Sequence, residues 1–134
     1  MLIRDSSSCP HHRVIDRSVL CELLHPGRTR ECAALSCSVA HAIVPPGEAT
    51  IPHRLRTATE ISSTLSGTGR MHIGEEVREI RAGHAVLIPP QEVRFIENCQ
   101  KADLVFLCIV SPPLRVDDEE LVSQGNNGPL PDNI

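Results

Sequence analysis

Two side chains that can bind metals lie close together in the segment 51–60, which reads IPHRLRTATE. His53 offers an imidazole nitrogen and Glu60 a carboxylate, and both are common ligands of divalent transition metals. Leu55 follows His53 by two residues, where a strand would place its side chain on the same face. A leucine cannot bind a metal. The segment therefore combines two candidate ligands with one position that excludes a third.

A further polar side chain, Arg94, follows in the segment 93–98 (VRFIEN). Its guanidinium stays protonated at physiological pH and has no lone pair, so it would repel a nearby metal ion. The same group can pair with Glu60 or hold the carboxylate or phosphate of a small ligand. Both roles need Arg94 to face the interior. A one-residue change of register would instead turn it to solvent and Phe95 inward.

The elements that position these side chains are predicted to be short β-strands. Proline and glycine recur at short intervals, and the runs between them are rich in Val, Ile, Leu and Thr. This spacing favours an all-β sandwich or barrel. Strands are predicted at 34–44, 60–65, 70–73, 76–80, 85–88, 93–98 and 104–110, with an additional strand in 14–24 and a tight hairpin around Gly74 and Glu75.

A chain of 134 residues is expected to form one domain. Residues 1–12 are interpreted as a flexible lead-in, 13–116 as the barrel, and 117–134 as an acidic and polar tail. We find no stretch with the apolar character of a signal peptide or a membrane span. A cytoplasmic protein without membrane contact is therefore expected.

The composition argues against nucleic-acid binding. The chain has two Phe, no Tyr or Trp, and a net charge of −4. Stacking platforms for bases and clustered cations for phosphates are both lacking. The six cysteines form no Cys-x-x-Cys pair, and most are expected to be small buried thiols.

Two spacing patterns in this chain resemble the two motifs of the cupin superfamily. The first family motif reads Gly, five residues, His, one, His, three or four, Glu, six, Gly, and here it falls on Gly47, His53, Leu55, Glu60 and Gly67. The second reads Gly, five, Pro, one, Gly, two, His, three, Asn, and here it falls on Gly83, Pro89, Gln91, Arg94 and Asn98. The resemblance implies a single-domain antiparallel jelly-roll β-barrel, usually dimeric, with its site in the barrel mouth.

The resemblance also implies a metal site of three His and one Glu. His53 and Glu60 match two of these ligands, whereas Leu55 and Arg94 replace the second and third His. The metal chemistry of the family, with Zn²⁺, Fe²⁺, Ni²⁺ or Mn²⁺, is therefore not simply inherited. His41 is a candidate replacement ligand, because both faces of its predicted strand are apolar and its direction is undecided.

The strand that begins at Glu60 adds information about the cavity. Alternation places Ser62 and Thr64 on the same face as Glu60. Their small hydroxyl side chains leave room and offer hydrogen bonds, which favours a small polar ligand, although both residues also suit a filled interface. Similarly, Leu55 is equally suited to fill the barrel wall, and His53 and Glu60 to hydrogen-bond each other.

Three functions stay open at this level. The first is a barrel that binds a small polar or anionic molecule through Arg94, Glu60, His53, Ser62 and Thr64. The second is a metal-dependent enzyme of the sugar isomerase, epimerase or dioxygenase type that uses His53, Glu60 and a replacement ligand such as His41. The third is a structural or interaction barrel. Catalytic residues are not assigned, and apolar residues on both faces of 39–44 and 104–110 predict a homodimer.

Overall fold

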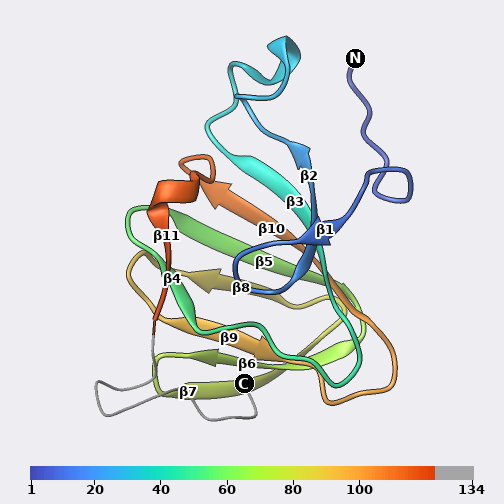
Figure 1. Cartoon of the computed structure of the whole chain (residues 1–134), viewed down its shortest axis with the longest axis vertical. Helices are drawn as coiled ribbons and strands as arrows, with labels where there is room; N and C mark the ends of the chain where they lie inside the picture. The colour runs from blue at the N-terminus through green and yellow to red at the C-terminus, as the bar shows by residue number, and fades with distance from the viewer. Residues whose placement is uncertain (123–134) are drawn as a thin grey trace.

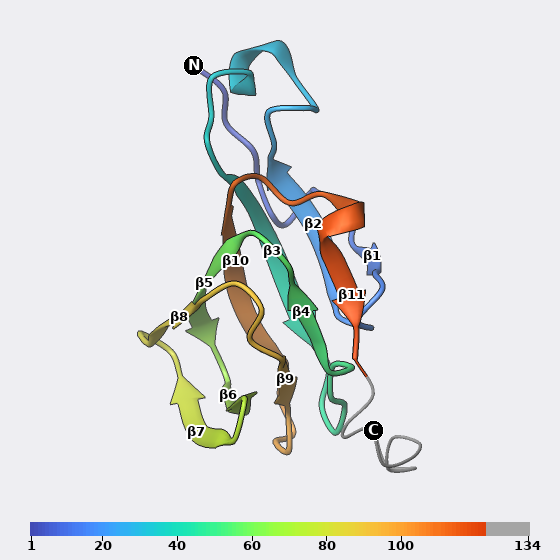
Figure 2. The ribbon, with the colours of Figure 1, turned by 90° about the vertical axis from the view of Figure 1, so that its left-hand side faces the viewer.

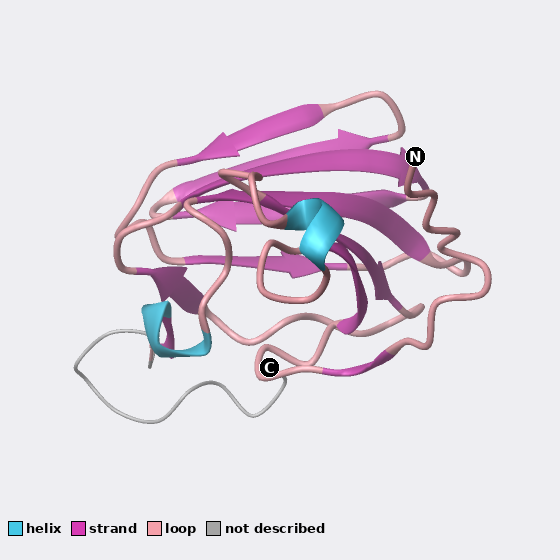
Figure 3. Cartoon of the chain, turned by 90° about the horizontal axis from the view of Figure 1, so that it is seen from above, coloured by secondary structure: helices cyan, strands magenta, loops and turns pink. Residues whose placement is uncertain are grey.

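The structure is a computed structural model of the chain and describes residues 1–122. Its strands are β1 (His12–Arg13), β2 (Val19–Leu24), β3 (Ser38–Val44), β4 (His53–Leu55), β5 (Thr59–Ser66), β6 (Thr68–Ile73), β7 (Glu76–Arg81), β8 (Ala85–Ile88), β9 (Arg94–Glu97), β10 (Leu104–Ser111) and β11 (Glu119–Leu121). Two 3-10 helices, η1 (Arg30–Cys32) and η2 (Val116–Asp118), lie in the connections (Figure 3). Within the described part, no helix is long and apolar enough to cross a membrane.

The strands form two antiparallel sheets (Figure 1). The six-stranded sheet has the order β1-β2-β3-β10-β5-β8, and the five-stranded sheet has the order β11-β4-β9-β6-β7. Strands distant in the sequence are therefore neighbours, as β3 and β10 are. The connection between β2 and β3, which carries η1, projects beyond the barrel near the N-terminus (Figure 2). These sheets confirm the predicted all-β, antiparallel jelly-roll barrel.

Alternation along the strands builds the interior. In β3 every second residue is buried, from Ser38 to Val44, and Phe106 of β10 pairs with Ala42 on the same inward face. Aliphatic and β-branched residues suit such a pleated, half-buried surface. The main core consists of Ala42, Val44, Met71, Ile80, Ile88, Ile96, Leu104 and Phe106, and a smaller cluster consists of Leu55, Ala58 and Val110.

The predicted strands agree with the structure apart from their ends. The strand at 85–88 has the predicted bounds, and the hairpin of β6 and β7 pairs Ile73 with Glu76 around the expected turn. The strand predicted in 14–24 begins only at Val19. The carboxylate of Asp16 accepts hydrogen bonds from the backbone and hydroxyl of Ser18, and Arg17 has a φ of 74°, so a turn precedes the strand.

The acidic run was predicted to belong to a solvated tail, and this is wrong for Asp118 and Glu119. Asp118 is 2% exposed, and its carboxylate accepts hydrogen bonds from the Thr57 N–H and hydroxyl and from the Ala58 N–H. β11 pairs with β4 and places Glu119 opposite Leu55. This part of the acidic run packs against the barrel because the Asp118 carboxylate accepts hydrogen bonds from buried donors of another segment. Residues 123–134 of the predicted tail lie outside the described residues.

The predicted lead-in, residues 1–12, is also not separate from the barrel. His12 begins β1, which pairs with β2. His11 contacts His41 of β3 through a ring-to-ring hydrogen bond of 2.9 Å. The barrel therefore includes contacts from both predicted terminal segments.

Candidate functional site

A cavity of about 350 Å³ has walls from both sheets. Small-molecule sites commonly have volumes of about 300–1000 Å³, so this cavity is at the small end of the range. Most of its walls are apolar, with Leu20, Ile88 and Phe106 among them. Six of its polar or charged lining residues carry the site described below: Asp16, His53, Glu60, Ser62, Arg94 and Glu119.

Arg94 faces this cavity and is 3% exposed. In β9 the buried residues are Arg94 and Ile96, so the register that would turn Arg94 to solvent is not adopted. Its Nη2 donates to Glu60 Oε1 at 2.6 Å, and its Nη1 donates to the Glu92 carbonyl at 3.2 Å. Its Nε has no hydrogen-bond partner among residues 1–122. The guanidinium is thus neutralised on one side and unsatisfied on another.

His53 lies opposite Arg94 in the pairing of β4 with β9, yet it contacts other groups. Its Nδ1 lies 2.6 Å from the Ile51 carbonyl, which can only accept, so Nδ1 carries the proton. Its Nε2 lies 3.4 Å from Asp16 Oδ2 and 3.8 Å from Glu119 Oε2. A direct His53–Glu60 hydrogen bond, one of the alternatives from sequence, is not formed in the described structure.

The carboxylates of Asp16 and Glu119 flank one imidazole. Burial raises the pKa of Glu119; the charges of Asp16 and Glu60 raise it further, whereas those of His53 and Arg94 lower it. With Nδ1 protonated, a neutral His53 would present the lone pair of Nε2 to these carboxylates. The repulsion between this lone pair and the two carboxylates is relieved by a proton or by a cation held between the three side chains. The group therefore favours positive charge at its centre.

Asp16, His53 and Glu119 also have the geometry of a metal-binding group. One donor atom from each lies within 4.8 Å of the others. The set of ligands implied by the family motifs does not fit, because Leu55 is 1% exposed in the wall and Arg94 brings a fixed positive charge. A cation would be held by one imidazole and two carboxylates instead. Such mixed nitrogen and oxygen donors suit Zn²⁺, Mn²⁺ or Fe²⁺.

The hydroxyl residues of β5 are both buried, but only one reaches the cavity. Ser62 is 1% exposed and lines the cavity, whereas Thr64, 2% exposed, does not line it. Thr64 pairs with Phe106 of β10. The sequence-based placement of Thr64 in the ligand site is therefore corrected. The hydroxyl of Ser62 has no hydrogen-bond partner within the described chain.

His41 does not complete a site with His53 and Glu60, and this expectation is wrong. β10 pairs Leu107 with His41 and Cys108 with Ala40, and Cys108 also pairs with Ser62. Ala40, Ser62 and Cys108 line the cavity, so His41 lies on the opposite, outer face of the sheet.

Sequence reasoning missed Asp16, Glu119 and Cys108 as residues of the cavity. Asp16 precedes β2 in a turn, and Glu119 was assigned to a tail. Burial, followed by the charges of Glu60 and Asp16, raises the pKa of the Cys108 thiol well above its usual range, so this thiol is neutral. No local pattern distinguishes these residues, because their positions depend on long-range strand pairing.

Comparison with known proteins decides the family. Residues 40–110 match the family model described as Cupin domain. This chain belongs to the cupin family. An uncharacterized protein of Methanocaldococcus jannaschii is 36% identical to it over 107 residues, which cover 80% of this chain and 83% of the relative.

Solved structures share the fold of this cupin at low sequence identity. A predicted oxalate decarboxylase from Thermotoga maritima superposes with a TM-score of 0.72 and 24% identity, covering 83% of this chain and 99% of that chain. Streptomyces PAC13, in a structure with uridine, has a TM-score of 0.70 and 15% identity, covering 91% of each chain. These likenesses support the cupin barrel and leave the chemistry of the cavity to its own residues.

Proposed function

We propose that this cupin binds a small polar molecule in the cavity between its sheets. The main support for this proposal is the position of Arg94. Its side chain is 3% exposed and faces the cavity, and its Nε has no hydrogen-bond partner in the described structure. An unsatisfied buried donor costs about 1–3 kcal/mol. The hydroxyl of Ser62 on the same cavity is also unpartnered there. Because both atoms are themselves buried, an acceptor oxygen of a ligand would satisfy them after a side-chain movement that exposes them to the cavity.

The charges in the cavity narrow the chemistry of this ligand. Because Glu60 already neutralises Arg94 at 2.6 Å, an uncharged oxygen is sufficient, and a carboxylate or phosphate would compete with Glu60. Asp16 and Glu119 can accept hydrogen bonds from ligand hydroxyl or amino groups. A hydroxylated molecule with an apolar part therefore fits better than a simple anion. Uridine, named with PAC13, is a molecule of this kind, although that protein shares only the fold.

A second candidate function is a metal-dependent enzyme of the isomerase, epimerase or dioxygenase type. It is favoured by the Asp16–His53–Glu119 group and by the contact of His53 Nδ1 with the Ile51 carbonyl. Metal-binding histidines usually donate their second N–H to a carbonyl or carboxylate, which directs the other nitrogen to the metal. In this case the ion would polarise a ligand oxygen in the cavity.

Binding is tested with named probes and matched variants. Ligand-observed NMR with uridine, oxalate and inorganic phosphate compares the wild type with Ser62→Ala and with the charge-balanced double variant Arg94→Met/Glu60→Gln. Uridine signals that broaden with the wild type, and do not with the variants, support a hydroxylated ligand. Preference for oxalate or phosphate would make the ligand an anion. If none of the probes is sensitive to these variants, the cavity is not the binding site.

The metal alternative needs a separate measurement. Elemental analysis of untagged protein compares the wild type with Asp16→Asn and His53→Gln. A metal content that is lower in both variants than in the wild type supports a metal in the cavity; equal metal contents exclude it.

We also propose that the protein is a cytoplasmic homodimer. The outer face of the six-stranded sheet exposes Ile61 (38%), Leu65 (48%) and Leu87 (64%). Apolar side chains gathered on one sheet face favour association with a second copy. The six cysteines are free thiols, as is usual in a reducing compartment.

A further inference from the structure

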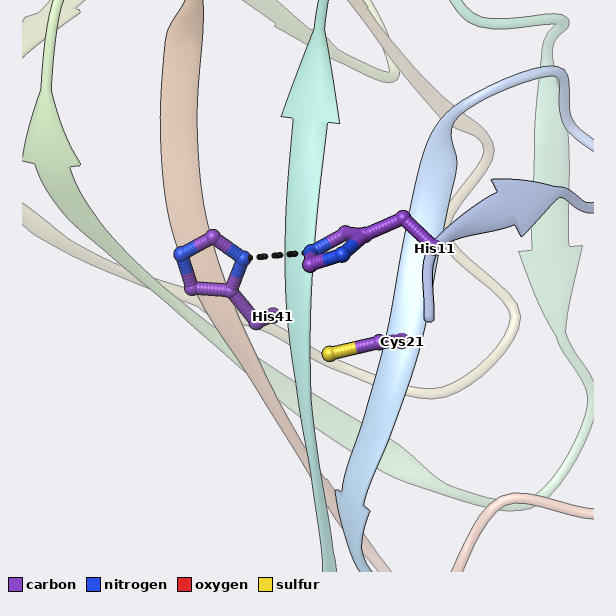
Figure 4. Close-up of side chains that lie close together, drawn as sticks. All are labelled: His11, Cys21 and His41. Atoms are coloured by element: carbon purple, nitrogen blue, oxygen red, sulfur yellow. Dashed lines mark hydrogen bonds between the residues drawn. The ribbon is translucent and has the colours of Figure 1, made fainter. Parts of the chain in front are cut away.

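Away from the cavity, three metal-binding side chains converge on the outer face of the six-stranded sheet: His11, Cys21 and His41 (Figure 4). Cys21 of β2 and His41 of β3 are direct cross-strand partners. His11, just before β1, approaches from the N-terminal segment, with its Nε2 2.9 Å from His41 Nδ1. One donor atom from each of the three lies within 4.8 Å of the others.

This cluster is distinct from the cavity. None of His11, Cys21 and His41 is among the cavity-lining residues of the described chain. His41 faces away from Ala40, which does line it. Cys21 is fully buried, while the two imidazoles are half-buried and can be reached by an ion. The cluster therefore has its own access from solvent.

We propose that His11, Cys21 and His41 bind a Zn²⁺ ion, with Cys9 as the fourth ligand. Two thiolates and two imidazoles form a standard tetrahedral zinc environment. Two of the ligands are on paired strands, so their separation is fixed by the sheet. The other two come from the Cys9-Pro10-His11 segment, which the ion would attach to the barrel.

The two imidazoles require little rearrangement to share an ion. Zn–N bonds of about 2.0–2.1 Å in a tetrahedron place two nitrogens about 3.4 Å apart. The nitrogens of His11 and His41 are 2.9 Å apart, so the two rings need to separate by only about half an ångström. His11 Nδ1 lies 2.9 Å from the Cys9 carbonyl. That contact holds the proton on Nδ1 and leaves the lone pair of Nε2 for the ion.

Cys9 lies beside the cluster, outside the three residues whose donor atoms lie within 4.8 Å of one another, and would move toward the ion as the fourth ligand. Its Sγ lies 3.8 Å from the Glu22 carbonyl, one residue beyond Cys21. Burial is the main cause that raises the pKa of the Cys21 thiol to about 12. Without a cation the Cys21 thiol is therefore neutral. Zinc would bind Cys9 and Cys21 as thiolates, with release of the thiol protons, while His41 moves its proton from Nδ1 to Nε2.

The test uses the full chain, untagged, reduced and stripped of metal. We expect one Zn²⁺ per chain in addition to any cavity metal, and we expect Co²⁺ to give thiolate-to-cobalt charge-transfer absorption. Cys9→Ser and His11→Ala should weaken Zn²⁺ binding by about tenfold or more and reduce this absorption. Cys99→Ser and His84→Ala are matched controls, because neither residue belongs to the cluster. Cys99 is exposed, and His84 lies between β7 and β8. Both should bind as the wild type does.

One further variant distinguishes metal binding in the cavity from metal binding at the zinc cluster. His53→Gln should keep the cobalt–thiolate absorption, because His53 is not part of the cluster. Three results would overturn the proposal: Co²⁺ bound without thiolate absorption, unchanged Zn²⁺ affinity in His11→Ala, or a Cys9–Cys21 disulfide in protein isolated without reductant. Circular dichroism of each variant shows that the barrel is folded, so loss of binding is not loss of fold.

Discussion

Arg94 Nη2 lies 2.6 Å from Glu60 Oε1 inside the barrel, with the two side chains 3% and 14% exposed. A charge pair thus occupies the region where the family pattern implies a histidine and a glutamate around a metal. The guanidinium contributes a fixed positive charge and directional donors, but no site for an exchangeable ligand. This relationship underlies the first two predictions.

The variant Arg94→Met is expected to lower the free energy of unfolding by about 3 kcal/mol, because Glu60 is left as an unpaired buried charge. Urea unfolding at neutral pH measures the change. The double variant Arg94→Met/Glu60→Gln removes both charges and should recover a large part of the loss. Equal stability of the single and double variants would show that the pair is not coupled.

Restoring the family ligands should create metal binding. In Leu55→His/Arg94→His, the two new imidazoles would join His53 and Glu60, and isothermal titration with Ni²⁺ should show a site absent from the wild type. Leu55→His alone should bind at least tenfold more weakly, because Arg94 repels the ion in a poorly screened cavity. The variant Leu55→Phe/Arg94→His is the control for side-chain size at position 55, because Phe has a ring but no metal-binding atom. Similar affinities with and without Arg94 would contradict the repulsion argument.

Asp118 is expected to make the free energy of unfolding depend on pH in the acid range. Burial opposes ionisation, but hydrogen bonds from Thr57 and Ala58 outweigh it and hold the pKa of Asp118 below its ordinary value of 3.8. The stabilisation is therefore present above this value and is lost as the pH falls through the lower, folded-state pKa. Asp118→Asn should cost about 1–3 kcal/mol at neutral pH and reduce the acid dependence.

The matched control for Asp118 is its neighbour Asp117, whose side chain is 77% exposed. Asp117→Asn should leave both the stability and its pH profile nearly unchanged. Urea unfolding between pH 2.5 and 7 compares the two variants. If both behave alike, the acidic run acts only through its net charge.

The outer sheet face should mediate dimerisation. Sedimentation at micromolar concentration is expected to give a dimer, and Leu87→Glu should shift it to the monomer by placing a charge in the apolar contact. Val77→Glu serves as control, because Val77 is 51% exposed on the other sheet. A monomeric wild type, or an equal effect of both variants, would contradict this interface.

The sequence by itself determined the fold class and the chemistry at Leu55 and Arg94. Turn residues and alternation are local patterns, so they predicted the all-β barrel, the β6–β7 hairpin and the inward face of β5. Motif spacing favoured the inward direction of Arg94, which the pairing of β9 with β6 then fixes. The number of residues between motif positions predicts the direction of a side chain because side chains alternate along a strand with a strict period of two.

The tertiary structure alone decided which side chains meet. Asp16 and Glu119 are far from His53 in the sequence, and only the turn before β2 and the pairing of β11 with β4 bring them to its Nε2. The outward direction of His41 follows from its register with β10, because a shift of one residue would have reversed it. Contacts of this kind depend on long-range pairing, which no short segment of the sequence contains.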